Sequence, residues 1–127
     1  MGTEETASRG NFLSQHEMIE ATIADEIRQV RAASKWGGGD RHLESLVKGD
    51  GLNVALVMLK KGARLNQHAN RAPFSVQVVE GSIAFIASGE RRLIGPGRIL
   101  AVRRGLPHAV EAIEDSAFIL TLGGESQ

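Results

Sequence analysis

Two stretches of the sequence decide the fold: GARLNQHANRAPFSVQVVEG at residues 62–81 and GRILAVRRGLPH at residues 97–108. Each begins with a glycine, and each contains one histidine, His68 or His108. Short apolar runs that alternate with glycine, proline and acidic residues are typical of strands joined by tight turns. Both stretches therefore predict β-structure.

The same pattern extends from about residue 41 to residue 122. The expected strands are Leu52–Leu59, Ser75–Val79, Ser82–Ala87, Ile99–Val102, His108–Ala112 and Ala117–Leu122. Turn residues separate them, as at Gly95-Pro96-Gly97. Several of the strands are apolar on both faces, so one face can fill a barrel and the other can meet a second sheet or a second subunit. An all-β barrel or sandwich over residues 41–127 is the expected domain.

The first 40 residues have a different character. Residues 1–13 are mostly polar and small and predict a flexible leader. Residues 14–40 predict one helix followed by a glycine-rich linker, since Ser14 and Glu17 match a capping box and apolar residues then recur at helical spacing. The apolar stripe consists of Ile19, Ile23, Ile27 and Val30. We expect the helix to run from about Ser14 to Ser34 and to dock on the β-domain or on a partner subunit, because isolated helices of this length are marginal in water.

Composition excludes several classes of protein. Fifteen Lys and Arg residues balance fifteen Asp and Glu residues, so no net charge favours nucleic acid or an anionic membrane. The absence of cysteine excludes a disulfide scaffold and a thiolate zinc site. No apolar run has the length of a transmembrane helix. We therefore expect a cytoplasmic protein with neither a nucleic-acid nor a membrane partner.

The two glycine-to-histidine stretches, in this order, resemble the two motifs of the cupin superfamily. The resemblance covers residues 52–122 and is closest to small single-domain cupins. It implies an antiparallel jelly-roll β-barrel of the RmlC-like type, here with an N-terminal helix. It also implies a homodimer, which the two-faced apolar strands favour independently.

The resemblance further implies where a divalent metal would bind. Cupins hold the metal with two histidines and a glutamate of the first motif and one histidine of the second, which correspond to positions 68, 70, 74 and 108. His68 and His108 match, whereas Asn70 and Phe74 replace a histidine and the glutamate. A facial iron site needs a carboxylate, and a zinc site needs four donors. We therefore expect no metal or a weakly bound divalent ion on His68 and His108, with Gln67 and Gln77 as further donors to consider.

The same four positions predict a pocket for a small organic ligand. His68, Asn70, Phe74 and His108 are expected to converge, with Phe74 as an apolar wall and the imidazoles as hydrogen-bonding groups. The alternative is that the two histidines are neutral side chains with structural hydrogen bonds. Basic side chains near the motifs are candidates for holding an anion: Arg64, Arg71, Arg103 and Arg104.

Three functional hypotheses follow. The first is a ligand-binding cupin of unknown substrate. The second is a cupin enzyme of the dioxygenase, isomerase or decarboxylase type, either metal-dependent or metal-free with histidine as general base. The third is a structural or interaction module. The catalytic residues and the substrate stay open at this point.

Overall fold

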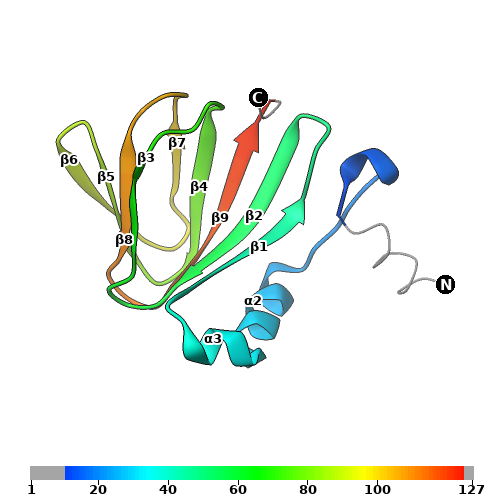
Figure 1. Cartoon of the computed structure of the whole chain (residues 1–127), viewed down its shortest axis with the longest axis horizontal. Coiled ribbons are helices and arrows are strands. Elements are labelled where there is room, and N and C mark those ends of the chain that lie inside the picture. Colours follow the sequence, from blue (N-terminus) through cyan, green and yellow to red (C-terminus); the bar gives the residue numbers. More distant parts are fainter. Residues whose placement is uncertain (1–10, 125–127) are drawn as a thin grey trace.

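Two antiparallel sheets form the body of the protein, seen in a computed structural model that describes residues 11–124 (Figure 1). The five-stranded sheet contains, in spatial order, β1 (Arg41–Val47), β2 (Leu52–Leu59), β9 (Ser116–Gly123), β4 (Phe74–Glu80) and β7 (Ile99–Val102). The four-stranded sheet contains β3 (Arg64–His68), β8 (His108–Ala112), β5 (Ile83–Ala87) and β6 (Glu90–Ile94). This order is a jelly roll. The expected barrel is here a pair of sheets that each end in edge strands, rather than a ring closed by hydrogen bonds.

The strands expected from apolar runs are confirmed. β2, β7 and β8 have the expected limits, β5 begins one residue later than expected, and β4 and β9 are each one residue longer at both ends. The sequence analysis missed β1, β3 and β6. β3 and β6 are mostly exposed, and β1 is mostly half-buried. All three contain arginine or glutamate, and each lies at the edge of a sheet, where charged residues are tolerated.

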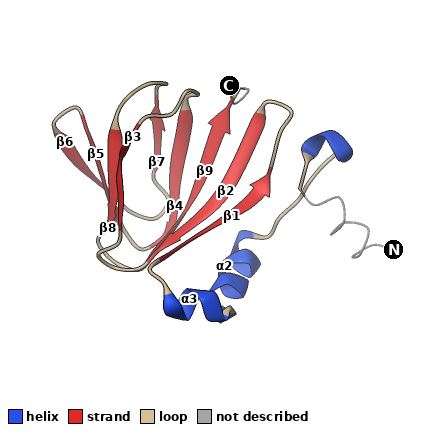
Figure 2. Ribbon diagram, viewed as in Figure 1, coloured by secondary structure: helices blue, strands red, loops and turns tan. Residues whose placement is uncertain are grey.

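The five-stranded sheet is covered on both faces. Along β2, Val57 and Leu59 point into the core between the sheets, whereas Leu56 and Met58 point to the opposite face. That opposite face packs against helix α2 (Ile23–Ala32), which lies beside β1 and β2 in Figure 2. The two-sided apolar character of β2 is therefore explained within one chain.

The helix is shorter than expected. Residues 14–22 were expected to be helical, but α2 begins after Thr22, and neither Thr22 nor any capping box caps it through a side chain. Ser14 lies instead in a short 3-10 helix, Leu13–Gln15. A second short helix, α3 (Ser34–Gly38), follows α2 and ends within the expected glycine linker.

The physical reason is a tether near the N-terminal end of the described chain. The Leu13 N–H donates to the Lys48 carbonyl at 2.9 Å, and the Lys48 N–H donates to Asn11 at 2.9 Å. Figure 1 shows the segment between this tether and α2 crossing from one end of the sheet toward the other. An extended residue covers about twice the distance of a helical residue, so an extended segment reaches farther between the tether and α2 than a helix of the same length would. The expected leader, residues 1–13, lies outside the described residues except for its last three.

One glycine is required by its surroundings. Gly81, between β4 and β5, has φ of 78°, and a Cβ atom there would lie 2.2 Å from the Asp115 carbonyl oxygen and 2.4 Å from Ser116 Oγ. Ser116 is buried, and its hydroxyl accepts the Ser82 N–H at 3.0 Å. The turn that ends the first of the two glycine-led stretches thus packs directly on the start of β9.

No helix within residues 11–124 is long and apolar enough to cross a membrane.

Candidate functional site

A β-bulge places His68 opposite His108. Leu65 of β3 pairs with Val110 of β8, and the register then shifts so that His68 pairs with His108. In regular alternation Gln67, two residues after Leu65, would share its face. The extra residue of the bulge turns His68 to that face instead, which is a common role of bulges beside functional sites.

The two imidazoles are close and similarly held. Their ring centroids lie 4.4 Å apart, with the planes at 58°. In each histidine the Nδ1 atom contacts the backbone carbonyl two residues earlier: Asn66 at 3.0 Å for His68 and Leu106 at 2.9 Å for His108. A carbonyl only accepts hydrogen bonds, so each Nδ1 carries the proton. In the neutral rings both Nε2 atoms are therefore acceptors.

His108 is the buried member of the pair. It is 4% exposed, and burial lowers the pKa of its imidazole, assisted by the neighbouring His68 and opposed by the Leu106 carbonyl. No described residue forms a hydrogen bond with the Nε2 atom of His108. In the described residues, every fully buried side-chain nitrogen or oxygen has a hydrogen-bond partner, so this Nε2 is not fully buried. The Nε2 atom must therefore be accessible, as a neutral acceptor near pH 7.

Aromatic rings surround His108. The Phe85 ring stacks on the imidazole at 5.2 Å and 12°, and the Phe74 ring lies 4.9 Å from it, with both phenylalanines nearly fully buried. These groups line a cavity of about 220 Å³ between the two sheets. We call it the histidine cavity. Asn70 also lines it, and the remaining walls are aliphatic or aromatic: Leu43, Val57, Leu65, Val76, Val110, Phe118 and Leu120.

Comparison of the structure with solved structures identifies the fold. An RmlC-like cupin from Shewanella frigidimarina superposes with a TM-score of 0.65 at 22% identity, over 71% of this chain and 81% of that one. An RmlC-like cupin from Desulfovibrio desulfuricans gives a TM-score of 0.62 at 20% identity, over 85% and 93% of the two chains. The protein has a cupin fold. KdgF from a Halomonas species is also similar, with a TM-score of 0.63 at 22% identity over 68% of this chain and 80% of that one.

No protein-family model and no curated protein matches the sequence. The comparison with solved structures is what confirms the cupin fold that the two motifs imply.

The cupin metal positions converge here, but with altered chemistry. His68, Asn70, Phe74 and His108 all line the histidine cavity. No group of three or more His, Cys, Asp or Glu side chains suited to a metal occurs in residues 11–124. Two imidazoles and one amide give fewer donors than a zinc site needs and no carboxylate for a facial iron site. This donor set does not fit a tightly held divalent ion.

The two glutamines considered as further donors lie elsewhere. Gln67 is exposed, because the bulge turns His68 instead of Gln67 to the face that Leu65 shares. Gln77 is exposed, while its neighbours Val76 and Val78 on β4 are buried, as alternation predicts. Neither glutamine lines the histidine cavity.

The four candidate arginines separate. Arg64 lies at the start of β3 and Arg104 lies in the β7–β8 turn. Both are exposed, and neither lines the histidine cavity. Arg71 lines a depression beside Asn70 and Gly124. Arg103 lines a larger pocket between the two sheets. The structure therefore does not gather the arginines into one anion site.

Sequence reasoning missed three contributors to the site. Phe85 stacks on His108, and the carbonyl groups of Asn66 and Leu106 set the tautomers of the two histidines. A signal for Phe85 was present, because it alternates with Ile83 on the inner face of β5. Each histidine contacts the backbone carbonyl two residues before it. Every residue type has such a carbonyl, so the sequence alone could not reveal these contacts.

Proposed function

We propose that the protein binds a small neutral organic molecule in the histidine cavity, through a hydroxyl or N–H group that donates to His68 or His108. The observation that carries the proposal is the paired Nδ1 contact with backbone carbonyls, which leaves two Nε2 acceptors for a cavity with otherwise apolar walls. A few placed polar groups in an apolar cavity are the usual form of a small-molecule site.

The chemistry favours a donor over an anion. A carboxylate would face the lone pairs of the two Nε2 atoms, which repel it. It could bind only if one imidazole took up a proton, and burial opposes this because it lowers the pKa of His108. A cavity of about 220 Å³ has the size for a single ring, since apolar cavities of this order accept benzene. Phe74 and Phe85 offer faces and edges for such a ring.

Phenol and toluene form a matched pair of probes, because they differ mainly in the hydroxyl group. Each is titrated into protein labelled with ¹⁵N while the imidazole nitrogens are followed by NMR, with His42 as an internal reference. Phenol should shift the Nε2 signals of His68 and His108 and bind more tightly than toluene. The variant His108→Asn, which keeps a donor near Leu106 but removes Nε2, should lose the preference for phenol. Equal affinity for both probes, or shifts confined to other residues, would contradict the proposal.

A metal-free proton transfer is the second candidate, favoured by the accessible and neutral Nε2 of His108. In this reaction Nε2 accepts a proton from a carbon acid next to a carbonyl group, and the bonding electrons move into the carbonyl. Deuterium exchange of the α protons of cyclohexanone in D₂O, followed by NMR, tests it. The protein should accelerate the exchange and the His108→Asn variant should not. Equal rates with and without the protein would leave binding as the only proposed function.

A further inference from the structure

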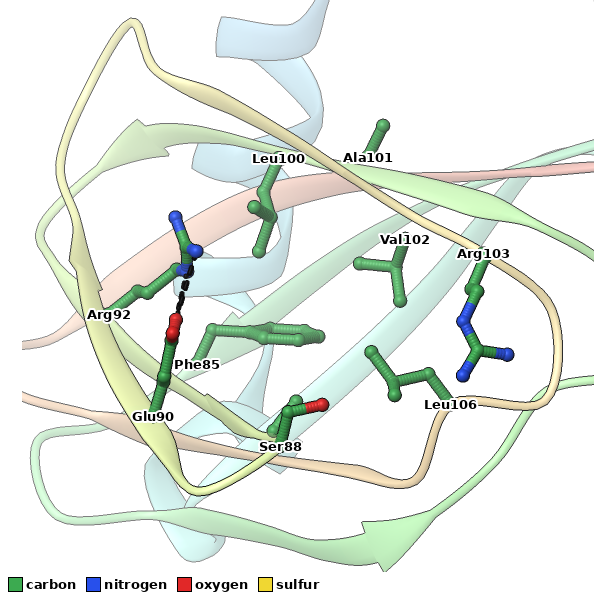
Figure 3. A pocket seen from close by; sticks show the side chains of 10 residues that line it. Phe85, Ser88, Glu90, Arg92, Leu100, Ala101, Val102, Arg103 and Leu106 are labelled. Carbon is green, nitrogen blue, oxygen red and sulfur yellow. Dashed lines mark hydrogen bonds and ion pairs between the residues drawn. The ribbon is translucent and has the colours of Figure 1, made fainter.

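A second and larger cavity opens at the side of the molecule, between edge strands β6 and β7 of the two sheets. Its volume is about 410 Å³, within the range of small-molecule sites. We call it the lateral pocket. Figure 3 shows Phe85, Leu100, Val102 and Leu106 around its interior, with charged side chains toward its two ends.

The charges at the two ends differ in their partners. At one end Glu90 and Arg92 form an ion pair, in which Arg92 Nε and Nη2 lie 3.1 and 2.9 Å from Glu90 Oε1. At the other end stands Arg103, whose Nη1 donates to the Arg104 carbonyl at 3.2 Å. No carboxylate in residues 11–124 pairs with Arg103. The pocket therefore has one guanidinium charge that no carboxylate of the described residues neutralises.

We infer that the lateral pocket binds a small monocarboxylate with an apolar body, and that Arg103 is the residue that selects the carboxylate. A guanidinium offers two parallel N–H groups that match the two oxygens of a carboxylate. Phe85, Leu100 and Leu106 provide apolar surface for the rest of the molecule. At the far end, Glu90 already neutralises the charge of Arg92, and the Glu90 carboxylate repels a second anionic group.

The lateral pocket is distinct from the histidine cavity. Phe85 is the lining residue that the two have in common, and their other lining residues differ. The two cavities also differ in chemistry, because one offers lone pairs and the other offers a positive charge. This inference is therefore independent of the function proposed above.

The test compares benzoate with benzyl alcohol, which has a similar body and no charge. Each is titrated into the full chain labelled with ¹⁵N, and backbone amide shifts give the affinity and the site. Benzoate should move the amides of β7 and of residues 87–92 and bind at least about fivefold more tightly than benzyl alcohol, as expected for a partly exposed charged hydrogen bond.

Variants at two adjacent arginines provide a matched comparison. Arg103→Gln should remove the preference for benzoate, whereas Arg104→Gln, which changes the net charge equally outside the pocket, should retain it. Leu100→Trp, which enlarges a side chain of β7 that faces the pocket, should weaken binding of both probes. His68→Asn should leave benzoate binding unchanged, because His68 lines only the other cavity.

Three outcomes would overturn the inference: an unchanged preference in Arg103→Gln, an equal loss in Arg104→Gln, or benzoate shifts centred on His68 and His108. Thermal melting of each variant verifies that it is folded. Arg103 and Arg104 are both exposed, so neither glutamine substitution removes core packing.

Discussion

At the scale of single residues, the turn at Gly81 depends on the absence of a side chain. Gly81→Ala should lower the free energy of unfolding by about 2 kcal/mol or more, because it combines a positive φ with overlap on the backbone of Asp115. Gly62 is a control: its φ is 87°, but a Cβ atom there would have no neighbour within 4 Å. Gly62→Ala should cost only about 1 kcal/mol. Urea unfolding of both variants measures the difference, and equal losses would show that the predicted overlap is relieved without cost.

The lowered pKa of His108 predicts a dependence of stability on pH. The imidazole binds a proton less readily in the folded protein than in the unfolded chain, where the reference pKa is 6.5. Its contribution to stability is therefore full above pH 6.5 and is lost as pH falls through the lowered pKa of the folded state. Urea midpoints between pH 8 and pH 5 should decline less in His108→Asn than in the parent protein. Parallel declines, with an NMR titration of the His108 ring at an ordinary pKa, would refute this account.

The metal chemistry of the histidine cavity should be recoverable. The double variant Asn70→His and Phe74→Glu supplies the two ligands that cupins have at these positions, on side chains that already line the cavity. Outer-shell partners alone change metal affinity by about 10- to 100-fold, so two added ligands should increase the affinity for Zn²⁺ or Mn²⁺ by more than about 100-fold. Calorimetric titration compares the double variant with each single variant and the parent. Equally tight binding by the parent would mean that another residue completes the site.

At the scale of elements, helix α2 is attached through two buried side chains. Ile27 and Val30 are 2% and 6% exposed against Leu56 and Met58 of β2. Ile27→Ala should lower the free energy of unfolding by about 2–4 kcal/mol, through lost burial and the space left behind. Gln29→Ala, on the exposed side of the same helix, should change it by less than about 0.5 kcal/mol. Chemical denaturation measures both, and a small effect at Ile27 would show that α2 adds little to the stability of the sheet.

The elements also show what a single sequence can and cannot predict. Apolar runs such as Leu52–Leu59 were located correctly because burial on both faces leaves a local signal. β3 and β6 have no such apolar signal, because their arginines Arg64, Arg91 and Arg92 are exposed. These segments are strands through their pairing with β8 and β5. The convergence of His68 and His108 could be expected from the motif resemblance. The bulge that aligns them depends on the register between two strands, which no local pattern encodes.

At the scale of the whole molecule, we predict a homodimer. Helix α2 covers the outer face of β2, so that face needs no second subunit to bury it. Large apolar side chains nevertheless remain exposed on the strands at the sheet edges. Leu43, Leu93 and Ile99 are 62%, 60% and 65% exposed, on β1, β6 and β7. Burying such side chains favours association. Sedimentation velocity at micromolar concentration should show twice the mass of the chain, and a single species of monomer mass would contradict the prediction.

The position of β9 also has a consequence for how the chain reaches its folded state. This strand lies between β2 and β4, although it follows β2 by more than 50 residues in the sequence. Until residues 116–123 have left the ribosome, β2 and β4 each have an unpaired edge and no common neighbour. Unpaired apolar edges recruit other chains, and pairing over long sequence separations is slow. The nascent protein is thus most exposed to aggregation just before the strand that joins the two halves of its larger sheet emerges from the ribosome.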